Sequence, residues 1–305
     1  MTFVVTGATG FIGLEVVNYL FKKGYQVYCV CRPNSPKVAL LPKGININIV
    51  YANMPDYSTL YQKIGSADVM VNLAWDGITR EGRNISEIQC DNISYTLHAM
   101  DSANMMGCRI FVETGSQAEY GIVNEVITED TPCNPFSDYG KAKLALKKAA
   151  SKHAEEIGIK YLHLRVFSVY GENDHPWSMI SSCTSKMLNN EEVELSACQQ
   201  LWNFLYVKDC AKQIVLLSEW AYKDMIKPYE IFNLASEDTR TLKCYIEEMC
   251  SLTGTQSRLL YGKMTPQHLV SLNPDISKLR NTIGFVSDYS FAEGYQNVIN
   301  KYKNG

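Results

Sequence analysis

The chain has 305 residues, of which 46% are hydrophobic, so it can bury a large core and is not expected to be disordered. Its formal net charge of −3 excludes the strongly basic surface on which binding to nucleic acids depends. The ten cysteines include no Cys-x-x-Cys pair, which argues against a structural zinc site and against a disulfide framework.

The first thirteen residues predict a strand, a glycine turn and the start of a helix. Residues 1–6 form a short apolar run, and three glycines at a spacing of three follow before a helical pattern opens. Such glycines allow a sharp turn, a close approach of the backbone to a pyrophosphate and tight packing of helix on strand. The helix N-terminus adds free N–H groups for the phosphates. Small residues also form ordinary turns, but the position favours nucleotide binding. The residues expected to contact a cofactor here are Gly7, Thr9, Gly10, Phe11, Ile12 and Gly13.

A second strand is predicted over residues 26–31, and the polar loop after it begins with Arg32. In a dinucleotide-binding fold this loop meets the adenosine ribose. An acidic residue there would bind the free 2′-hydroxyl of NAD, whereas Arg32 offers a planar cation that suits the 2′-phosphate of NADP. The sequence therefore favours NADP(H), with NAD(H) possible; the alternative is that Arg32 only solvates the end of the loop.

Strands and helices continue to alternate up to residue 160. The pattern predicts strands over 45–51, 68–73 and 108–114 and helices over 57–64 and 85–106. This alternation is typical of a Rossmann-type, doubly wound parallel sheet, which binds ligands at the carboxyl ends of its strands. Residues at those ends are therefore expected at the cofactor: Leu73, Ala74, Trp75 and Thr114.

Beyond residue 160 the elements become short and mixed. One more strand is predicted over 161–169, helices over 179–188 and 208–220, and short strands over 193–196, 204–207 and 230–234. We predict two units: a Rossmann domain over 1–170 that carries the catalytic residues, and a smaller C-terminal α/β substrate-binding lobe over 171–305. The segment of about 204–235 is expected to return to the Rossmann domain.

Tyr139 and Lys143 lie four residues apart at the start of a predicted helix, so they share one helical face. A neighbouring cation favours the phenolate form of a tyrosine, which suits an acid/base catalyst. The alternative is an ordinary exposed helix start. The order of the chain favours catalysis, because Ser116 stands just past the end of the preceding strand and Asn92 lies on the helix before that strand.

With these residues in this order, the chain resembles the NAD(P)-dependent epimerase/dehydratase family of extended short-chain dehydrogenases. The likeness runs from Gly7 to Lys143 and continues more loosely to residue 234. It implies that Tyr139 is the general acid/base, that Lys143 binds the nicotinamide ribose, and that the Ser116 hydroxyl polarises the substrate oxygen. It also places Asn92 where the superfamily supports the lysine and a proton-relay water, and Asn53 where an aspartate often meets the adenine amine.

The resemblance also narrows the reaction. Dehydratases of the family carry an Asp-Glu pair directly after the active-site hydroxyl, whereas Gln117 and Ala118 follow Ser116 here. We therefore expect NADPH-dependent reduction of a CDP- or dTDP-linked 4-keto-6-deoxy sugar for surface polysaccharide synthesis. The alternative is an NAD-dependent nucleotide-sugar 4-epimerase. A second alternative from another class is a non-catalytic NADP-binding sensor.

The substrate side departs from the family pattern. Many members have an arginine for the substrate diphosphate where this chain has Trp202, which can stack on a base or sugar but cannot neutralise phosphate. The compensating cation is expected among Lys186, Lys278 and Arg280. The residues expected to bind the substrate are Gln117, Glu119, Ser168, Trp202 and Arg280.

No apolar run approaches the roughly 18 residues of a membrane helix, and the glycine turn begins too early to leave room for a signal peptide. We therefore expect a cytoplasmic protein without a membrane anchor or a metal. The helices that hold Asn92 and Tyr139 are the ones that related enzymes pair between subunits, which makes a homodimer the expected assembly.

Overall fold

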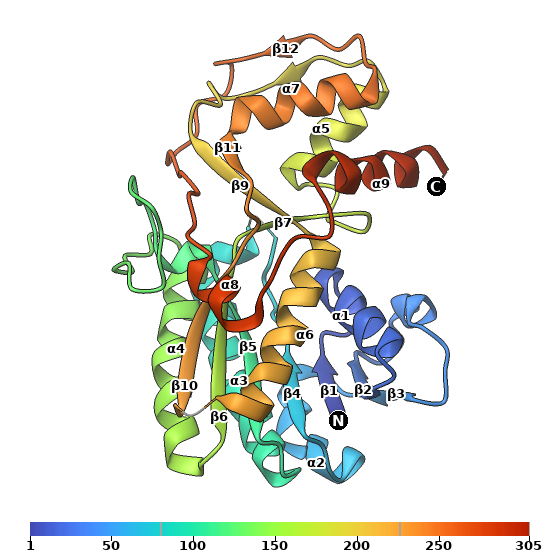
Figure 1. Cartoon of the computed structure of the whole chain (residues 1–305), viewed down its shortest axis with the longest axis vertical. Coiled ribbons are helices and arrows are strands. Elements are labelled where there is room, and N and C mark those ends of the chain that lie inside the picture. Colours follow the sequence, from blue (N-terminus) through green and yellow to red (C-terminus); the bar gives the residue numbers. More distant parts are fainter. Residues whose placement is uncertain (80, 226, 305) are drawn as a thin grey trace.

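The computed structural model describes residues 1–79, 81–225 and 227–304, and it has a seven-stranded sheet at its centre (Figure 1). The strand order is β10-β6-β5-β4-β1-β2-β3, and all paired neighbours run parallel. This confirms the predicted doubly wound Rossmann-type fold. The strands of this sheet are β1 (Thr2–Thr6), β2 (Gln26–Cys31), β3 (Ile47–Tyr51), β4 (Val69–Asn72), β5 (Ile110–Ser116), β6 (Lys160–Val166) and β10 (Tyr229–Leu234).

Helices cover both faces of the large sheet, and the apolar strands bury side chains on both sides. In β1, Phe3 and Val5 pack in the core cluster that includes α1 and α6, whereas Val4 packs with α3 and α4. This alternation follows from the two-residue period of a strand. The helices are α1 (Phe11–Lys22), α2 (Leu60–Ile64), α3 (Ser86–Met105), α4 (Asp138–Ile157), α5 (Met179–Leu188), α6 (Val207–Asp224), α7 (Leu242–Thr253), α8 (Ser277–Ile283) and α9 (Phe291–Asn304).

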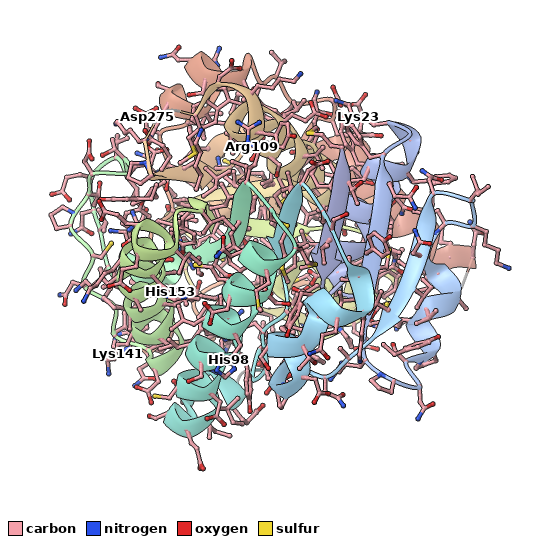
Figure 2. All side chains as sticks on the ribbon, turned by 90° about the horizontal axis from the view of Figure 1, so that it is seen from below. Lys23, His98, Arg109, Lys141, His153 and Asp275 are labelled. Carbon is pink, nitrogen blue, oxygen red and sulfur yellow. The ribbon has the colours of Figure 1, made fainter. Side chains whose placement is uncertain are left out.

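Figure 2 shows the two helical layers from below the sheet. His98 of α3 and Lys141 and His153 of α4 lie on the outer side of one layer, and His153 bridges the two helices through Asp101 at 2.6 Å. Lys23, on the other face, pairs with Glu219 of α6 at 2.7 Å. None of the described helices is long and apolar enough to cross a membrane.

A smaller lobe stands over the carboxyl ends of the large sheet (Figure 1). Its strands are β7 (Ser168–Tyr170), β9 (Leu201–Tyr206) and β11 (Thr239–Thr241), which form one sheet, and β8 (Val193–Glu194) and β12 (Leu259–Leu260), which form a second pair. Helices α5, α7 and α9 pack around them in a separate core. Within the segment 204–235, α6 and β10 lie with the large sheet, whereas β9 pairs with β7 and β11.

Several elements differ from the sequence prediction. The strand expected over 161–169 is divided, because β6 stays in the large sheet and β7 pairs with β9. The helix expected over 57–64 begins earlier as a 3-10 turn, η2 (Met54–Thr59), in which a proline occupies the first turn and Asn53 caps the N-terminus. The sequence pattern predicts no element after residue 234, where the structure has α7, α8 and α9.

Candidate active site

A cavity of about 1190 Å³ lies at the carboxyl edge of the large sheet and extends under the smaller lobe. The sheet order reverses between β1 and β4, which is where open α/β sheets bind dinucleotides. Seventeen of the predicted site residues line it: Gly7, Thr9, Gly10, Phe11, Ile12, Gly13, Arg32, Leu73, Ala74, Trp75, Thr114, Ser116, Gln117, Tyr139, Lys143, Ser168 and Trp202.

The glycine turn has no room for side chains. Gly7 has a φ of +62°, and a Cβ there would come within 2.9 Å of the Ala74 nitrogen. A Cβ on Gly13 would overlap the carbonyl oxygen of Gly7, which explains how α1 packs directly on the turn. The start of α1 therefore lies at the cavity, where Gly10, Phe11 and Ile12 line it, and the N-terminus of a helix is the kind of site that binds a pyrophosphate.

The loop after β2 brings two cations to the same cavity. Arg32 and Lys37 both line it, together with Ser35 and Pro36, and this part of the lining contains no carboxylate. Lys37 lies on η1 (Pro36–Leu40) and was not singled out in the sequence, because a lysine in a polar loop carries no distinguishing pattern. The arrangement suits a ribose that bears a 2′-phosphate.

Ser116 and Tyr139 are brought together by two helix starts. Ser116 caps η4 (Gln117–Glu119), and its Oγ accepts a hydrogen bond from the Ala118 N–H at 3.2 Å. Ser137 caps α4, which places Tyr139 in the first turn. The two starts touch at Gly140, where a Cβ would come within 2.5 Å of the Ala118 carbonyl oxygen. The small residue at 140 thus lets the phenol and the hydroxyl face one cavity.

Lys143 is buried and anchored to the sheet. Its Nζ donates to Glu113 Oε1 at 3.1 Å and to the Thr114 carbonyl at 2.7 Å, and it lies 3.4 Å from the centre of the Trp75 ring. Glu113 also accepts a hydrogen bond from Asn72 at 2.6 Å. Burial raises the pKa of the Glu113 carboxyl, and the neighbouring Lys143 charge opposes that rise.

The loop between β4 and α3 packs against Lys143 through Trp75, and two side-chain amides of α3 hold the loop. Gln89 accepts a hydrogen bond from the Trp75 indole at 2.8 Å and donates to the Gly82 carbonyl at 2.9 Å. Asn92 binds both backbone groups of Asp76, at 2.9 and 3.0 Å, and donates to the Ile88 carbonyl. Trp75 meets Tyr139 edge to face, so the loop determines the environment of the phenol.

The comparisons with known proteins identify the family of the chain. A model of the NAD-dependent epimerase/dehydratase family matches residues 3–235, which is well over half of the chain. The chain belongs to this family. Membership confirms the predicted resemblance and the predicted class, an NAD(P)-dependent enzyme of the extended short-chain dehydrogenase type. It does not separate a reductase from an epimerase.

Three proteins that are similar to this chain illustrate the range of the family. The CDP-abequose synthase of Salmonella muenchen is 24% identical over 97% of this chain and 96% of its own. The UDP-glucose 4-epimerase of Thermotoga maritima, solved with UDP-glucose, is 22% identical, covers 99% of both chains and has a TM-score of 0.87. The UDP-glucuronic acid 4-epimerase of Bacillus cereus, solved with UDP-glucuronic acid and NAD, has the same identity, coverage and TM-score. The two solved structures support the fold.

Glu119 is not placed as a substrate-binding residue, which corrects the sequence prediction. Its side chain is fully buried and pairs with His163 and Arg165, each at 2.9 Å, while it accepts a hydrogen bond from the Ser116 N–H. Burial by itself would raise the pKa of this carboxyl, but His163 and Arg165 outweigh it and lower the pKa to about 2. Glu119 therefore supports the strand end that carries Ser116.

Three other predicted contacts also lie outside the cavity lining. Arg280 is exposed on α8, so it is not the compensating cation for the substrate. Asn53 is the N-cap residue of η2, where its N–H donates to the Asp56 carboxylate at 3.3 Å. The Asn92 side chain is occupied by hydrogen bonds to backbone groups of Asp76 and Ile88. Among the other candidates, Lys278 is bound to Glu230 at 2.6 Å, and Lys186 does not line the cavity.

The sequence prediction missed Glu113 and Arg83. Glu113 had a usable signal, because an acidic residue inside a continuous apolar strand needs a buried partner. Arg83 had no such signal in the sequence, because it lies in a polar loop. The course of that loop in the folded protein brings it to the cavity.

Proposed function

We propose that this protein is an NADPH-dependent reductase of a 4-keto-6-deoxy nucleotide sugar, CDP- or dTDP-linked, that serves surface polysaccharide synthesis. The observation that carries the proposal is the convergence of Ser116, Tyr139 and Lys143 on the cavity that also holds Arg32 and Lys37. The glycine turn fits the cofactor, because a Cβ at Gly7 or Gly13 would collide with neighbouring backbone, so the glycines allow the close packing of strand, turn and helix that a pyrophosphate site at the start of α1 needs.

The residues divide the chemistry in a simple way. When bound, NADPH supplies the hydride. Ser116 holds the ketone oxygen by a hydrogen bond, and Tyr139 gives that oxygen its proton. Lys143 is positioned by Glu113 and Thr114 beside the tyrosine, where its charge favours the phenolate that remains. Gln117, Ser168 and Trp202 surround the sugar and nucleotide in the part of the cavity that faces the smaller lobe over residues 171–305.

A nucleotide-sugar 4-epimerase is the second candidate. It is favoured by the solved relatives, among which the Bacillus cereus 4-epimerase was solved with NAD. The absence of an acidic residue from the described lining after β2 favours NADP(H) and an exchangeable reductant instead. Pairing into a homodimer through α3 and α4, and a cytoplasmic location, stay predictions of the sequence.

The test is turnover by the purified protein. We expect net oxidation of NADPH, followed by absorbance, with at least one CDP- or dTDP-4-keto-6-deoxyhexose. Tyr139→Phe should lower kcat by about 10²- to 10⁴-fold, the usual contribution of a general acid, while the affinity for NADPH is retained. Interconversion of a UDP-hexose without net loss of NADPH would instead identify the protein as an epimerase. An unaffected Tyr139→Phe variant would refute the catalytic assignment.

A further inference from the structure

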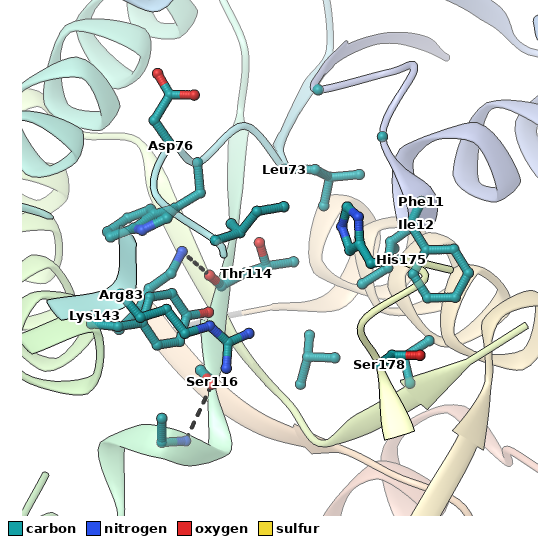
Figure 3. A pocket seen from close by; sticks show the side chains of 18 of the residues that line it. Phe11, Ile12, Leu73, Asp76, Arg83, Thr114, Ser116, Lys143, His175 and Ser178 are labelled. Atoms are coloured by element: carbon teal, nitrogen blue, oxygen red, sulfur yellow. Dashed lines mark hydrogen bonds between the residues drawn. The ribbon is translucent and has the colours of Figure 1, made fainter. Parts of the chain in front are cut away.

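Arg83 is a cation at the end of the cavity that holds Tyr139, and it has no role in the proposed reaction. It lies on η3 (Gly82–Asn84), in the loop between β4 and α3, and its guanidinium carbon is 4.9 Å from the centre of the Tyr139 ring. Figure 3 shows Arg83 with Lys143 and Ser116 on one side of the cavity, across from Phe11 and His175.

The guanidinium has no acidic partner in the part of the chain that the structure describes. Arg83 forms no ion pair there, and its side chain makes no hydrogen bond to another described residue. The neighbouring Lys143 differs, because its charge is matched by the buried Glu113. Burial lowers the pKa of His175, the Asp174 carboxylate opposes this effect, and the more weakly acting charges of Lys37 and Arg83 add to it.

The other described cations of the cavity lie elsewhere or are already paired, so Arg83 is the one expected to meet an anionic group of the substrate. Among the described lining residues the lysines and arginines are Arg32, Lys37, Arg83 and Lys143. Arg32 and Lys37 follow β2 at the cofactor end, and Lys143 is already paired. The described lining from the smaller lobe includes Trp202 but no lysine or arginine. A substrate oxyanion near the catalytic tyrosine therefore has Arg83 as its available described partner.

We propose that Arg83 binds an oxyanion of the substrate beside Tyr139. The guanidinium carbon lies over the phenol ring at 4.9 Å, and the N–H groups make no hydrogen bond to another described residue, so they can bind a phosphate in a bidentate manner. The oxyanion is the diphosphate that links sugar and nucleoside, because a 4-keto-6-deoxy sugar carries no carboxylate of its own. This inference rests on the proposed function, which places the sugar at Tyr139.

Hydrogen bonds and close packing fix the backbone of the loop directly before Arg83. Gln89 donates hydrogen bonds to the carbonyls of Gly77 and Gly82, at 3.1 and 2.9 Å, and these two glycines are in close contact. A Cβ on Gly82 would lie 2.8 Å from the Gly77 Cα, so only small residues allow the loop to close there. Arg83 follows the closed point directly, which reduces the entropy lost when an anion binds.

The experiment measures anion binding by calorimetry to the full chain saturated with NADP⁺, so that the start of α1 is occupied. The probes are inorganic pyrophosphate, dTDP-glucose, UDP-glucose and UDP-glucuronic acid. Arg83→Gln removes the charge, and Arg83→Lys keeps the charge without the planar fork. Arg109→Gln is the matched control, because Arg109, labelled in Figure 2, also lies over a tyrosine ring, that of Tyr222 at 4.5 Å, but does not line the cavity.

We expect Arg83→Gln to weaken binding about tenfold or more, Arg83→Lys to weaken it less, and the control to bind like the wild type. A loss for pyrophosphate and all nucleotide sugars supports the contact with the diphosphate, whereas a loss confined to UDP-glucuronic acid would show that Arg83 binds a sugar carboxylate and would contradict it. Unchanged affinities in Arg83→Gln, or a wild type that binds none of the probes, would overturn the inference. Tyr139→Phe keeps the ring and should bind the anions normally, so loss of turnover in that variant tests the proposed function separately.

Discussion

At the residue scale, Arg32 carries the proposed preference for NADP(H) over NAD(H), two cofactors that differ by a single phosphate. We predict that Arg32→Ala raises the Kd for NADPH about tenfold to hundredfold, because a hydrogen-bonded ion pair to the 2′-phosphate contributes about 1.5–3 kcal/mol. The Kd for NADH should stay the same, since NADH has no such phosphate. Titration of both cofactors, followed by fluorescence, measures the ratio.

Lys43→Ala provides the control for Arg32, because Lys43 is an exposed lysine of the same segment that does not line the cavity. Removal of both Arg32 and Lys37 should cost more than removal of Arg32 alone. Equal losses for NADPH and NADH would show that Arg32 shapes the loop and does not read the phosphate.

At the scale of elements, the loop between β4 and α3 depends on Asn92. We predict that Asn92→Ala lowers the free energy of unfolding by about 1–3 kcal/mol, because it leaves the backbone groups of Asp76 without their partner. Activity should fall as well, since Trp75 and Arg83 then lose their fixed positions. Urea unfolding and steady-state kinetics measure the two effects.

Ser94→Ala, an exposed substitution on the same helix, controls for changes in α3 itself. A variant Asn92→Ala that loses activity with unchanged stability would favour the proton-relay role implied by the family resemblance over the anchoring role seen in the hydrogen bonds.

For the whole molecule, the buried Glu119 cluster makes stability depend on pH. The pKa of this carboxyl lies at about 2 in the folded protein, below its ordinary value of 4.5. Its contribution is therefore fully present above about pH 4.5 and is lost as the pH falls towards 2, because the unfolded chain takes up the proton first. A difference of this size corresponds to about 3 kcal/mol.

We accordingly predict that Glu119→Gln lowers the free energy of unfolding by about 3 kcal/mol at pH 7, where His163 and Arg165 would lose their partner. The difference from the wild type should narrow as the pH falls below 4.5. Urea unfolding at a series of pH values measures it, and a difference that does not change with pH would contradict the ion-pair explanation.

The sequence by itself determined the fold class, the family and seventeen of the residues that line the cavity. Strand and helix periods, and the spacing of Gly7, Gly10 and Gly13, are local properties that chain neighbours carry. Tyr139 and Lys143 were also readable, because four residues along a helix fix which side chains share a face. Thus most elements up to residue 234, and the edge of the sheet at which ligands are expected, followed from short-range pattern, whereas α7, α8 and α9 did not.

Only the tertiary structure decided which polar side chains face the cavity and which are used inside the protein. In the sequence, Glu119 and Asn92 look free to bind a ligand. In the structure, Glu119 pairs with His163 and Arg165, and Asn92 binds the Asp76 backbone. Arg83 looks like an ordinary loop residue, yet the closed loop places it over Tyr139. The physical reason is that a polar group seeks a partner wherever the fold supplies one, and the partners of these residues come from distant parts of the chain.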